Sequence, residues 1–413
     1  MLELLPNKKE SIMQKQIPLS FTIIIVLIWS LPALSTDIYL PSMPSMAKYF
    51  STTLSEVQYT IFFYTAGFSI GALFFGPMSD RFGRKPIILI SLLIAAISAL
   101  FTTFATSLEV LFIARFIQGI ALAGVGSTMR AVTKDVCPDK ESMATFGAIL
   151  GIAIPIANAV APIIGGYIES YLNWRVSFGV VLVYTIIFLF YAYFNLPETN
   201  NNRLQSSLKT LLHDYKDVLT NKVFFRYNAV TAFALCSLYA YITISPKILQ
   251  IKVGLTPEEF GYSNLLFSVS LILSSYINSK LLPAHGIDKM LKFGAKMLGA
   301  AGLIFLFIGV FSWYNLYIIM FALCILVFGC GFIFPTASAG GLSLFTNRAG
   351  TAGAIYGCIQ MFGGSSGSAF ITLITREHFD PLIGLGLFII IQALIGIILS
   401  NQLIKLNHST NLV

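Results

Sequence analysis

Long apolar segments recur along almost the whole chain, and they restrict its fold more than any other feature of the sequence. A helix of about 20 apolar residues crosses a bilayer core about 30 Å thick, and twelve segments of that length can be counted. Their approximate bounds are 17–40, 57–78, 87–106, 108–131, 143–168, 174–195, 224–245, 260–281, 291–311, 313–336, 350–374 and 382–405. Because 56% of the residues are hydrophobic and only 11% are charged, an ordinary soluble domain is excluded. We predict an all-α membrane protein with 12 transmembrane helices.

The distribution of positive charge predicts the orientation of these helices. Of the 26 Lys and Arg residues, Arg115 lies within an apolar segment and only five others fall in the loops on one side of the membrane. These five are Lys48, Arg175, Lys247, Lys252 and Arg376. Positive residues concentrate on the cytoplasmic side of membrane proteins, so we expect both termini to be cytoplasmic. The net charge of +8 then reflects orientation in the membrane, and we set nucleic-acid binding aside.

The longest polar stretch divides the chain into two parts of nearly equal length. It covers residues 196–222 and separates residues 1–195, with six apolar segments, from residues 223–413, with six more. A parallel repeat of this kind places a substrate site near the middle of the membrane, between the two parts. Within the stretch, residues 204–219 have apolar residues at helical spacing, which is compatible with an amphipathic helix on the membrane surface or with a solvated linker.

One carboxylate, that of Asp37, lies inside an apolar segment, while the other acidic residues lie at segment ends or between segments. A carboxylate at membrane depth is costly unless it is protonated, paired or hydrated, so it is a candidate functional group. The nearest candidate partner is Arg115, a cation well inside another segment. The pair would serve either ion coupling or the structural fixing of two helices.

Enzymatic chemistry and metal binding are not indicated by the sequence. The five cysteines form no CxxC pair, and the four histidines lie in loops or in the tail. The chain contains no phosphate-binding GxxxxGK[ST] loop, so we expect an ion gradient rather than ATP to supply energy. No charge ring or filter-like loop suggests a channel. We therefore predict no cofactor and no metal, with protons favoured over sodium as the coupling ion.

A charged loop follows the second apolar segment, and it carries a specific motif. An acid at a helix end, a glycine turn and two bases can cap a neighbouring helix and hold one conformation. The residues of this predicted latch are Gly76, Asp80, Arg81, Gly83, Arg84 and Lys85. The run resembles the loop signature GxLaDrxGrrP of the major facilitator superfamily. That resemblance implies a fold of two six-helix bundles and a monomeric transporter of small molecules, surrounded by membrane lipid.

Two further segments resemble superfamily signatures of proton-coupled transport. Arg115 to Gly119 is similar to RxxQG, in which the resemblance gives the arginine a role in coupling. The fifth segment is similar to the antiporter signature gxxxGPxxGG, with Ala157 and Ala161 at two glycine positions. The small and proline residues of this predicted antiporter-type helix are Gly147, Gly151, Pro155, Pro162, Gly165 and Gly166.

Within the superfamily, Ser35 to Pro41 and Arg130 to Asp135 look like the bicyclomycin and chloramphenicol resistance branch (Bcr/CflA). The resemblance implies a proton antiporter that exports small, partly apolar molecules across a bacterial inner membrane. Trp29 stands where some similar multidrug exporters carry a second acid. The alternatives are an exporter of one metabolite, such as a siderophore or an amino acid, and a member of the superfamily that is not an antiporter.

Polar, aromatic and sulfur-containing side chains inside apolar segments are the candidates for lining a substrate cavity. They are Tyr39, Tyr64, Gln118, Asn158, Tyr239, Asn264, Gln360 and Met361.

Overall fold

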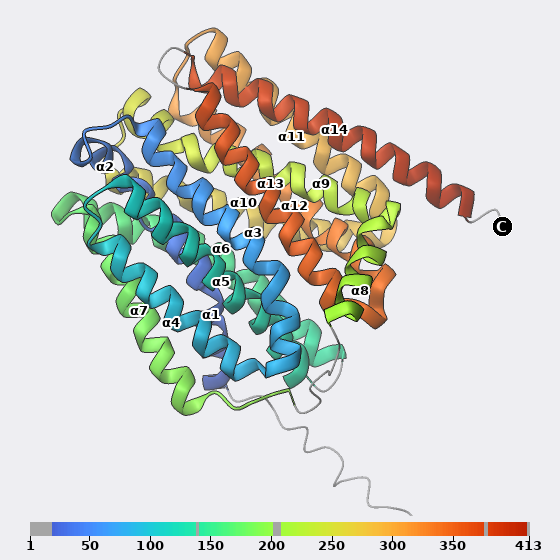
Figure 1. Ribbon diagram of the computed structural model, residues 1–413. Coiled ribbons are helices and arrows are strands. Elements are labelled where there is room, and N and C mark those ends of the chain that lie inside the picture. Colours follow the sequence, from blue (N-terminus) through green and yellow to red (C-terminus); the bar gives the residue numbers. More distant parts are fainter. Residues whose placement is uncertain (1–18, 138–139, 201–207, 376–378, 411–413) are drawn as a thin grey trace, which may run out of the picture.

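The computed structural model describes residues 19–137, 140–200, 208–375 and 379–410. Helices make up most of these residues, and no strand occurs among them. The α-helices (Figure 1) are α1 Leu19–Asp37, α2 Met43–Tyr49, α3 Leu54–Phe82, α4 Arg84–Thr103, α5 Leu108–Val136, α6 Lys140–Tyr171, α7 Trp174–Asn195, α8 Leu208–Thr220, α9 Lys222–Pro246, α10 Pro257–His285, α11 Ile287–Val310, α12 Leu316–Leu342, α13 Ala349–Ile374 and α14 Pro381–Thr410. Three short helical segments are η1 Leu40–Ser42, η2 Lys247–Lys252 and η3 Ser343–Arg348. The predicted all-α class is confirmed.

Eleven helical stretches among the described residues are long and apolar enough to cross a membrane. The remaining predicted segment, 350–374, coincides with α13, which is long enough but is not one of the eleven. Glycine and serine residues dilute the hydropathy of this helix. The chain is thus a multi-pass membrane protein, and eleven of the twelve predicted segments are helices with the length and composition of membrane spans.

The first span is broken rather than continuous. The helix α1 ends at Asp37, a short 3-10 turn follows, and α2 begins at Met43. Pro41 and Pro44 lie at the starts of the turn and of α2, where a missing backbone N–H costs no helical hydrogen bond. The sequence analysis placed one segment over 17–40 and did not predict this break, which leaves Asp37 at a helix end.

Side-chain caps fix several helix starts close to their predicted positions. Asn221 and Asn315 each accept hydrogen bonds from two backbone N–H groups at the starts of α9 and α12. Thr256 and Glu259 form a capping box at the start of α10. Each cap satisfies N–H groups that the helix itself leaves free.

For description, the long helices are divided by their place in the chain into two sets, and these sets contact each other. We call α1 to α7 the N-terminal helices, in which α5 packs on α3 and α4, and α9 to α14 the C-terminal helices, in which α9 packs on α12, α13 and α14. The two sets meet where α3 lies along α13 and α6 lies along α10 (Figure 1). Large apolar side chains such as Phe74, Ile113 and Phe321 are about 60% exposed on the outside, as expected for helices that face lipid.

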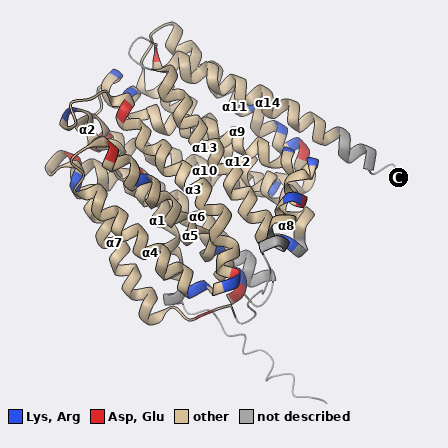
Figure 2. Cartoon of the chain, viewed as in Figure 1, with Lys and Arg blue, Asp and Glu red and all other residues tan. Residues whose placement is uncertain are grey.

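Charged side chains gather near the ends of the long helices, and most of the helix length carries none (Figure 2). We call the end that holds the turns at Gly83 and Gly286 the basic end, because most Lys and Arg residues belong to its loops.

The linker helix α8 docks at this basic end. Arg348, just before α13, pairs with Asp214 at 3.1 Å and with Asp217 at 2.7 Å. The Arg348 hydrogen bond lowers the pKa of the Asp217 carboxyl. The Tyr215 hydroxyl donates to the Leu73 carbonyl of α3. The predicted linker helix is therefore confirmed from residue 208 onward, and it contacts both sets of long helices. Its position on the membrane surface stays a prediction.

Candidate functional site

Arg115, in the third turn of α5, has no exposed surface. Its Nη1 donates to the Ser35 carbonyl at 3.0 Å, to the Ser35 hydroxyl at 3.2 Å and to Oε1 of Gln118 at 2.7 Å. Its Nη2 lies 3.5 Å from the Tyr39 hydroxyl. The guanidinium is thus held by neutral acceptors from α1, α5 and the residues that follow α1.

Aromatic rings complete the surroundings of this buried cation. The guanidinium carbon lies 4.3 Å from the ring centroid of Tyr64 and 4.7 Å from that of Tyr39. Tyr64 is fixed in turn because its hydroxyl donates to the Pro32 carbonyl at 3.0 Å. Cation–π contacts of this kind gain strength where water is excluded, so they help to offset the cost of burying Arg115.

Asp37 lies half-buried at the end of α1, close enough to Arg115 to interact with it electrostatically. No ion pair of up to 4.0 Å joins the two in the described part of the chain, and no hydrogen bond of the Asp37 carboxylate is formed there. The direct pair predicted from the sequence is therefore not made in this structure. Instead, Nη1 of Arg115 donates to Ser35 and Gln118, Nη2 lies near the Tyr39 hydroxyl, and the buried Nε has no hydrogen-bond partner in the described part of the chain.

The C-terminal helices contribute one residue, Tyr239, to the surroundings of Asp37 and Arg115. This residue of α9 interacts electrostatically with Asp37, Tyr64, Arg115 and Tyr39. We call Tyr39, Tyr64, Gln118 and Tyr239, together with Asp37 and Arg115, the central cluster. The structure thus assembles four of the eight predicted cavity residues around the predicted coupling pair.

The other four predicted cavity residues do not join the central cluster through hydrogen bonds. Asn264 donates to the Phe260 carbonyl of its own helix at 3.0 Å. Met361 packs against both large apolar cores. Asn158 and Gln360 are half-buried. A polar residue within an apolar segment is therefore not by itself a sufficient signal for the cluster.

The predicted antiporter-type helix α6 uses only some of its glycines for close packing. A Cβ at Gly165 would lie 1.7 Å from the Ile38 carbonyl oxygen, and one at Gly166 would lie 2.4 Å from that of Pro257. Close contacts at these two positions join α6 to the break after α1 and to α10. At Gly147 and Gly151, by contrast, nothing lies within 4 Å of such a Cβ. Pro155 and Pro162 lie inside the continuous helix.

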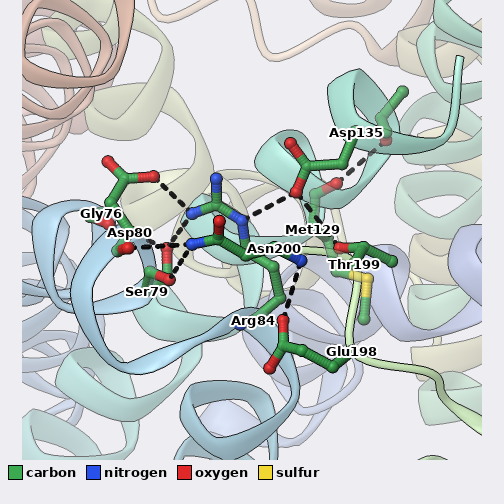
Figure 3. A network of polar contacts seen from close by, with 10 residues as sticks. Gly76, Ser79, Asp80, Arg84, Met129, Asp135, Glu198, Thr199 and Asn200 are labelled. Atoms are coloured by element: carbon green, nitrogen blue, oxygen red, sulfur yellow. Dashed lines mark hydrogen bonds and ion pairs between the residues drawn. The ribbon is translucent and has the colours of Figure 1, made fainter. Parts of the chain in front are cut away.

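A second polar site lies at the basic end, where the predicted latch is found (Figure 3). Arg84 donates to Asp80 of α3 at 2.5 Å, to Asp135 of α5 at 2.9 Å and to the Ser79 hydroxyl at 2.8 Å. The Arg84 side chain is only 9% exposed. It therefore ties the ends of α3 and α5 to the start of its own helix, α4.

The segment that follows α7 closes this latch from the other side. Glu198 accepts from the Arg84 backbone N–H at 2.8 Å and so caps the N-terminus of α4. The backbone turns at Gly83 with a φ of +104°, and a Cβ there would lie 2.3 Å from Oε2 of Glu198, so only glycine fits. Asn200 donates to the Asp80 carbonyl at 2.8 Å.

The sequence motif predicted part of this arrangement. Asp80 lies beside the first turn of the neighbouring helix α13, since its Oδ2 is 3.2 Å from a Cβ built on Gly350. Arg81 is exposed and contacts the ring of Phe82, and Lys85 makes no ion pair within the described ranges, so neither joins the predicted latch. The sequence analysis included Asp135 in a motif, but it did not bring Asp135 or Glu198 together with Arg84. Their shared signal is an acid at the end of a span.

Among residues 19–137, 140–200, 208–375 and 379–410, no group of three His, Cys, Asp or Glu side chains is arranged to hold a metal ion.

Comparison with known proteins identifies the family. The Major Facilitator Superfamily model matches residues 25–368. The chain is 26% identical over 91% of its length to a bicyclomycin resistance protein homolog of Haemophilus influenzae, covering 94% of that protein. It is 25% identical to multidrug resistance protein D of Escherichia coli, covering 94% of this chain and 95% of the relative. A chloramphenicol resistance protein of Pseudomonas aeruginosa is 24% identical, with 86% and 84% covered.

Solved structures show the same fold. A D-xylose-proton symporter superposes with a TM-score of 0.72 at 16% identity, covering 91% of this chain and 96% of that one. A bacterial homolog of the human lysosomal transporter Spinster gives 0.68 at 15% identity, covering 93% and 97%. The curated relatives match the resistance branch that the sequence resembles. The chain belongs to the Major Facilitator Superfamily and is a membrane transporter rather than an enzyme.

Proposed function

We propose that this transporter is a proton-coupled antiporter that exports small, partly apolar molecules. The observation that carries this proposal is the central cluster. It places one carboxylate, Asp37, next to one buried cation, Arg115, where α9 of the C-terminal helices reaches the N-terminal helices through Tyr239. A single acid beside a single base suits proton exchange better than the multi-oxygen site that a bound sodium ion needs.

The antiport cycle follows because the substrate and the proton compete for the surroundings of Asp37. Because Nη1 of Arg115 donates to Ser35 and Gln118 rather than to Asp37, the Asp37 carboxylate is left free to exchange a proton. A substrate that binds among Tyr39, Tyr64 and Tyr239 changes the water and the charge around Asp37, so substrate binding and protonation exclude each other. The names of the relatives, which refer to bicyclomycin, chloramphenicol and multiple drugs, support drug-like molecules as substrates.

The test is substrate-dependent release of protons from acidified vesicles. Purified protein is placed in liposomes with an acidic interior, and an entrapped dye reports the internal pH. We expect added chloramphenicol, used as the probe, to speed the escape of protons and to accumulate inside. Panels of siderophores and amino acids extend the search to the alternative substrate classes. Uptake of any of these probes without proton movement would contradict antiport.

We further propose that residues 1–195 and 223–413 form two six-helix bundles joined by the 196–222 linker, in a monomer of a bacterial inner membrane. The basic end would face the cytoplasm, because Lys and Arg residues concentrate there. A substrate path between the bundles is supported by the contacts of α3 with α13 and of α6 with α10.

The orientation predicts the pattern of labelling in intact cells. A cysteine in place of the exposed Leu212 of α8 should resist a membrane-impermeant thiol reagent, because α8 lies at the basic end. A cysteine in place of Thr53, in the exposed turn at the opposite end, should be labelled at once. The parent protein with its own five cysteines is the control for background. Rapid labelling at position 212 with protection at position 53 would reverse the orientation.

A further inference from the structure

Arg130 is a second cation in the region where the two sets of long helices meet, and the central cluster does not use it. It lies on α5, fifteen residues after Arg115, which is about 22 Å along the helix axis toward the basic end. Its Nη2 lies 3.6 Å from a Cβ built on Gly357 of α13, and the same Cβ would lie 3.9 Å from Ala72 of α3. The guanidinium thus reaches from an N-terminal helix to a C-terminal one.

This cation has no acceptor of its own. The side chain is exposed, and among the described residues Arg130 makes no ion pair and no hydrogen bond. The other arginines close to the junction differ in this respect, because Arg84 and Arg348 each pair with two carboxylates and Arg115 is surrounded by neutral acceptors. An accessible guanidinium with five free donors is suited to bind a planar anion.

Polar side chains of the C-terminal helices lie near this cation. Tyr356, which interacts electrostatically with Arg130, has its hydroxyl 3.1 Å from that of Thr231 on α9. One helical turn away on α9, Asn228 is completely buried, and both polar atoms of its amide lack a hydrogen-bond partner among the described groups. Its amide is a further polar group on the same helix as Thr231, and it is closed off from solvent in this structure.

The balance of charge within the membrane region points to a negative ligand. On α5, the charged residues more than one turn from a helix end are Arg115 and Arg130, and Asp37 lies at the break that ends α1. Asp37 and Arg115 offset each other, so Arg130 leaves one positive charge without compensation. A monoanionic ligand would neutralise it, whereas a cationic ligand would be repelled.

We propose that Arg130 forms an anion-binding subsite, which binds a carboxylate or a similar single negative charge on the transported molecule at the basic end of its path. This inference rests on the proposed export function, and it narrows the substrate class to molecules that carry a negative group. A substrate bound here would face Tyr356 and α13 before it reached the central cluster.

The test compares two dyes that share a ring system and differ in charge. The full chain is held in nanodiscs of phosphatidylcholine, which contain no anionic lipid to compete, and binding is followed by fluorescence polarisation without any ion gradient. We expect anionic fluorescein to bind more tightly than cationic rhodamine 6G. In Arg130→Gln the affinity for fluorescein should fall about tenfold or more, while rhodamine 6G binds no more weakly than before.

Lys134 provides a matched control, because it is an exposed cation one turn further along α5. Lys134→Gln makes the same change in net charge, and it should leave the affinity for fluorescein unchanged. Arg130→Lys keeps the positive charge and should retain part of the affinity for fluorescein. This result would show that the loss in Arg130→Gln comes from the missing charge and not from misfolding. Tighter binding of rhodamine 6G to the unchanged protein, or equal losses in Arg130→Gln and Lys134→Gln, would overturn the subsite.

These binding measurements separate the subsite from the proposed antiport. If fluorescein binding depends on Arg130 but no substrate releases protons from liposomes, the subsite stands and proton antiport fails. If protons are released by neutral chloramphenicol while fluorescein does not bind, antiport stands and the subsite is wrong.

Discussion

Asp37→Asn should reduce gradient-driven export to the level of protein-free vesicles. The amide keeps the size of the carboxylate but cannot carry a proton, so the exchange step at the central cluster is lost. Because Arg115 is held by Ser35, Tyr39 and Gln118 rather than by Asp37, the surroundings should survive the change. We therefore expect binding of neutral chloramphenicol to change by less than about threefold, and the remaining exchange to lose its dependence on pH.

The control for this experiment is Glu56→Gln. Glu56 is an exposed acid in the first turn of α3, at the end opposite the basic end, and its neutralisation should leave export unchanged. Counterflow, which needs substrate exchange but no net proton movement, should persist in Asp37→Asn. Export at the unchanged rate with the original pH dependence would make Asp37 structural and would refute the coupling mechanism.

Arg84→Gln should lower the free energy of unfolding by about 3 kcal/mol, because it leaves two partly buried carboxylates without their cation. The affected carboxylates are those of Asp80 and Asp135, with exposed side-chain fractions of 27% and 21%. Thermal unfolding of the purified protein in detergent measures the effect. Arg81→Gln removes an equal charge from the same loop at an exposed position. It should change the free energy of unfolding by less than about 0.5 kcal/mol.

The milder change Asp80→Asn tests the latch itself. It removes the negative charge beside the first turn of α13 but keeps the Arg84 contact with Asp135. We expect the basic ends of α3 and α13 to separate more often. Spin labels on cysteines in place of the exposed Met78 and of Gly353, whose Cβ position is open, would report that distance. An unchanged distance distribution together with collapsed transport would disprove the latch.

The sequence by itself determined the membrane class and the approximate positions of the long helices. Apolar segments of bilayer length have few alternatives to a spanning helix, since every backbone polar group must be satisfied within the segment. Capping residues such as Asn221 and Asn315 then fixed the helix starts locally. The two polar sites were also found in outline. The central cluster was indicated because a charge inside an apolar segment is costly, and the latch was indicated by the motif of its loop.

Only the tertiary structure decided which groups meet. Whether Arg115 would bind the Asp37 carboxylate or neutral acceptors depended on the break at Pro41, which positions Ser35 and Tyr39 around it. The latch depended on Glu198, which lies 114 residues from the N–H group that it caps. Helix propensity and hydropathy act over short stretches of chain, whereas these contacts depend on how helices from distant parts of the chain pack together. For the same reason the sequence placed Arg130 in a motif, but only the packing of α5 against α13 revealed a cation without a partner.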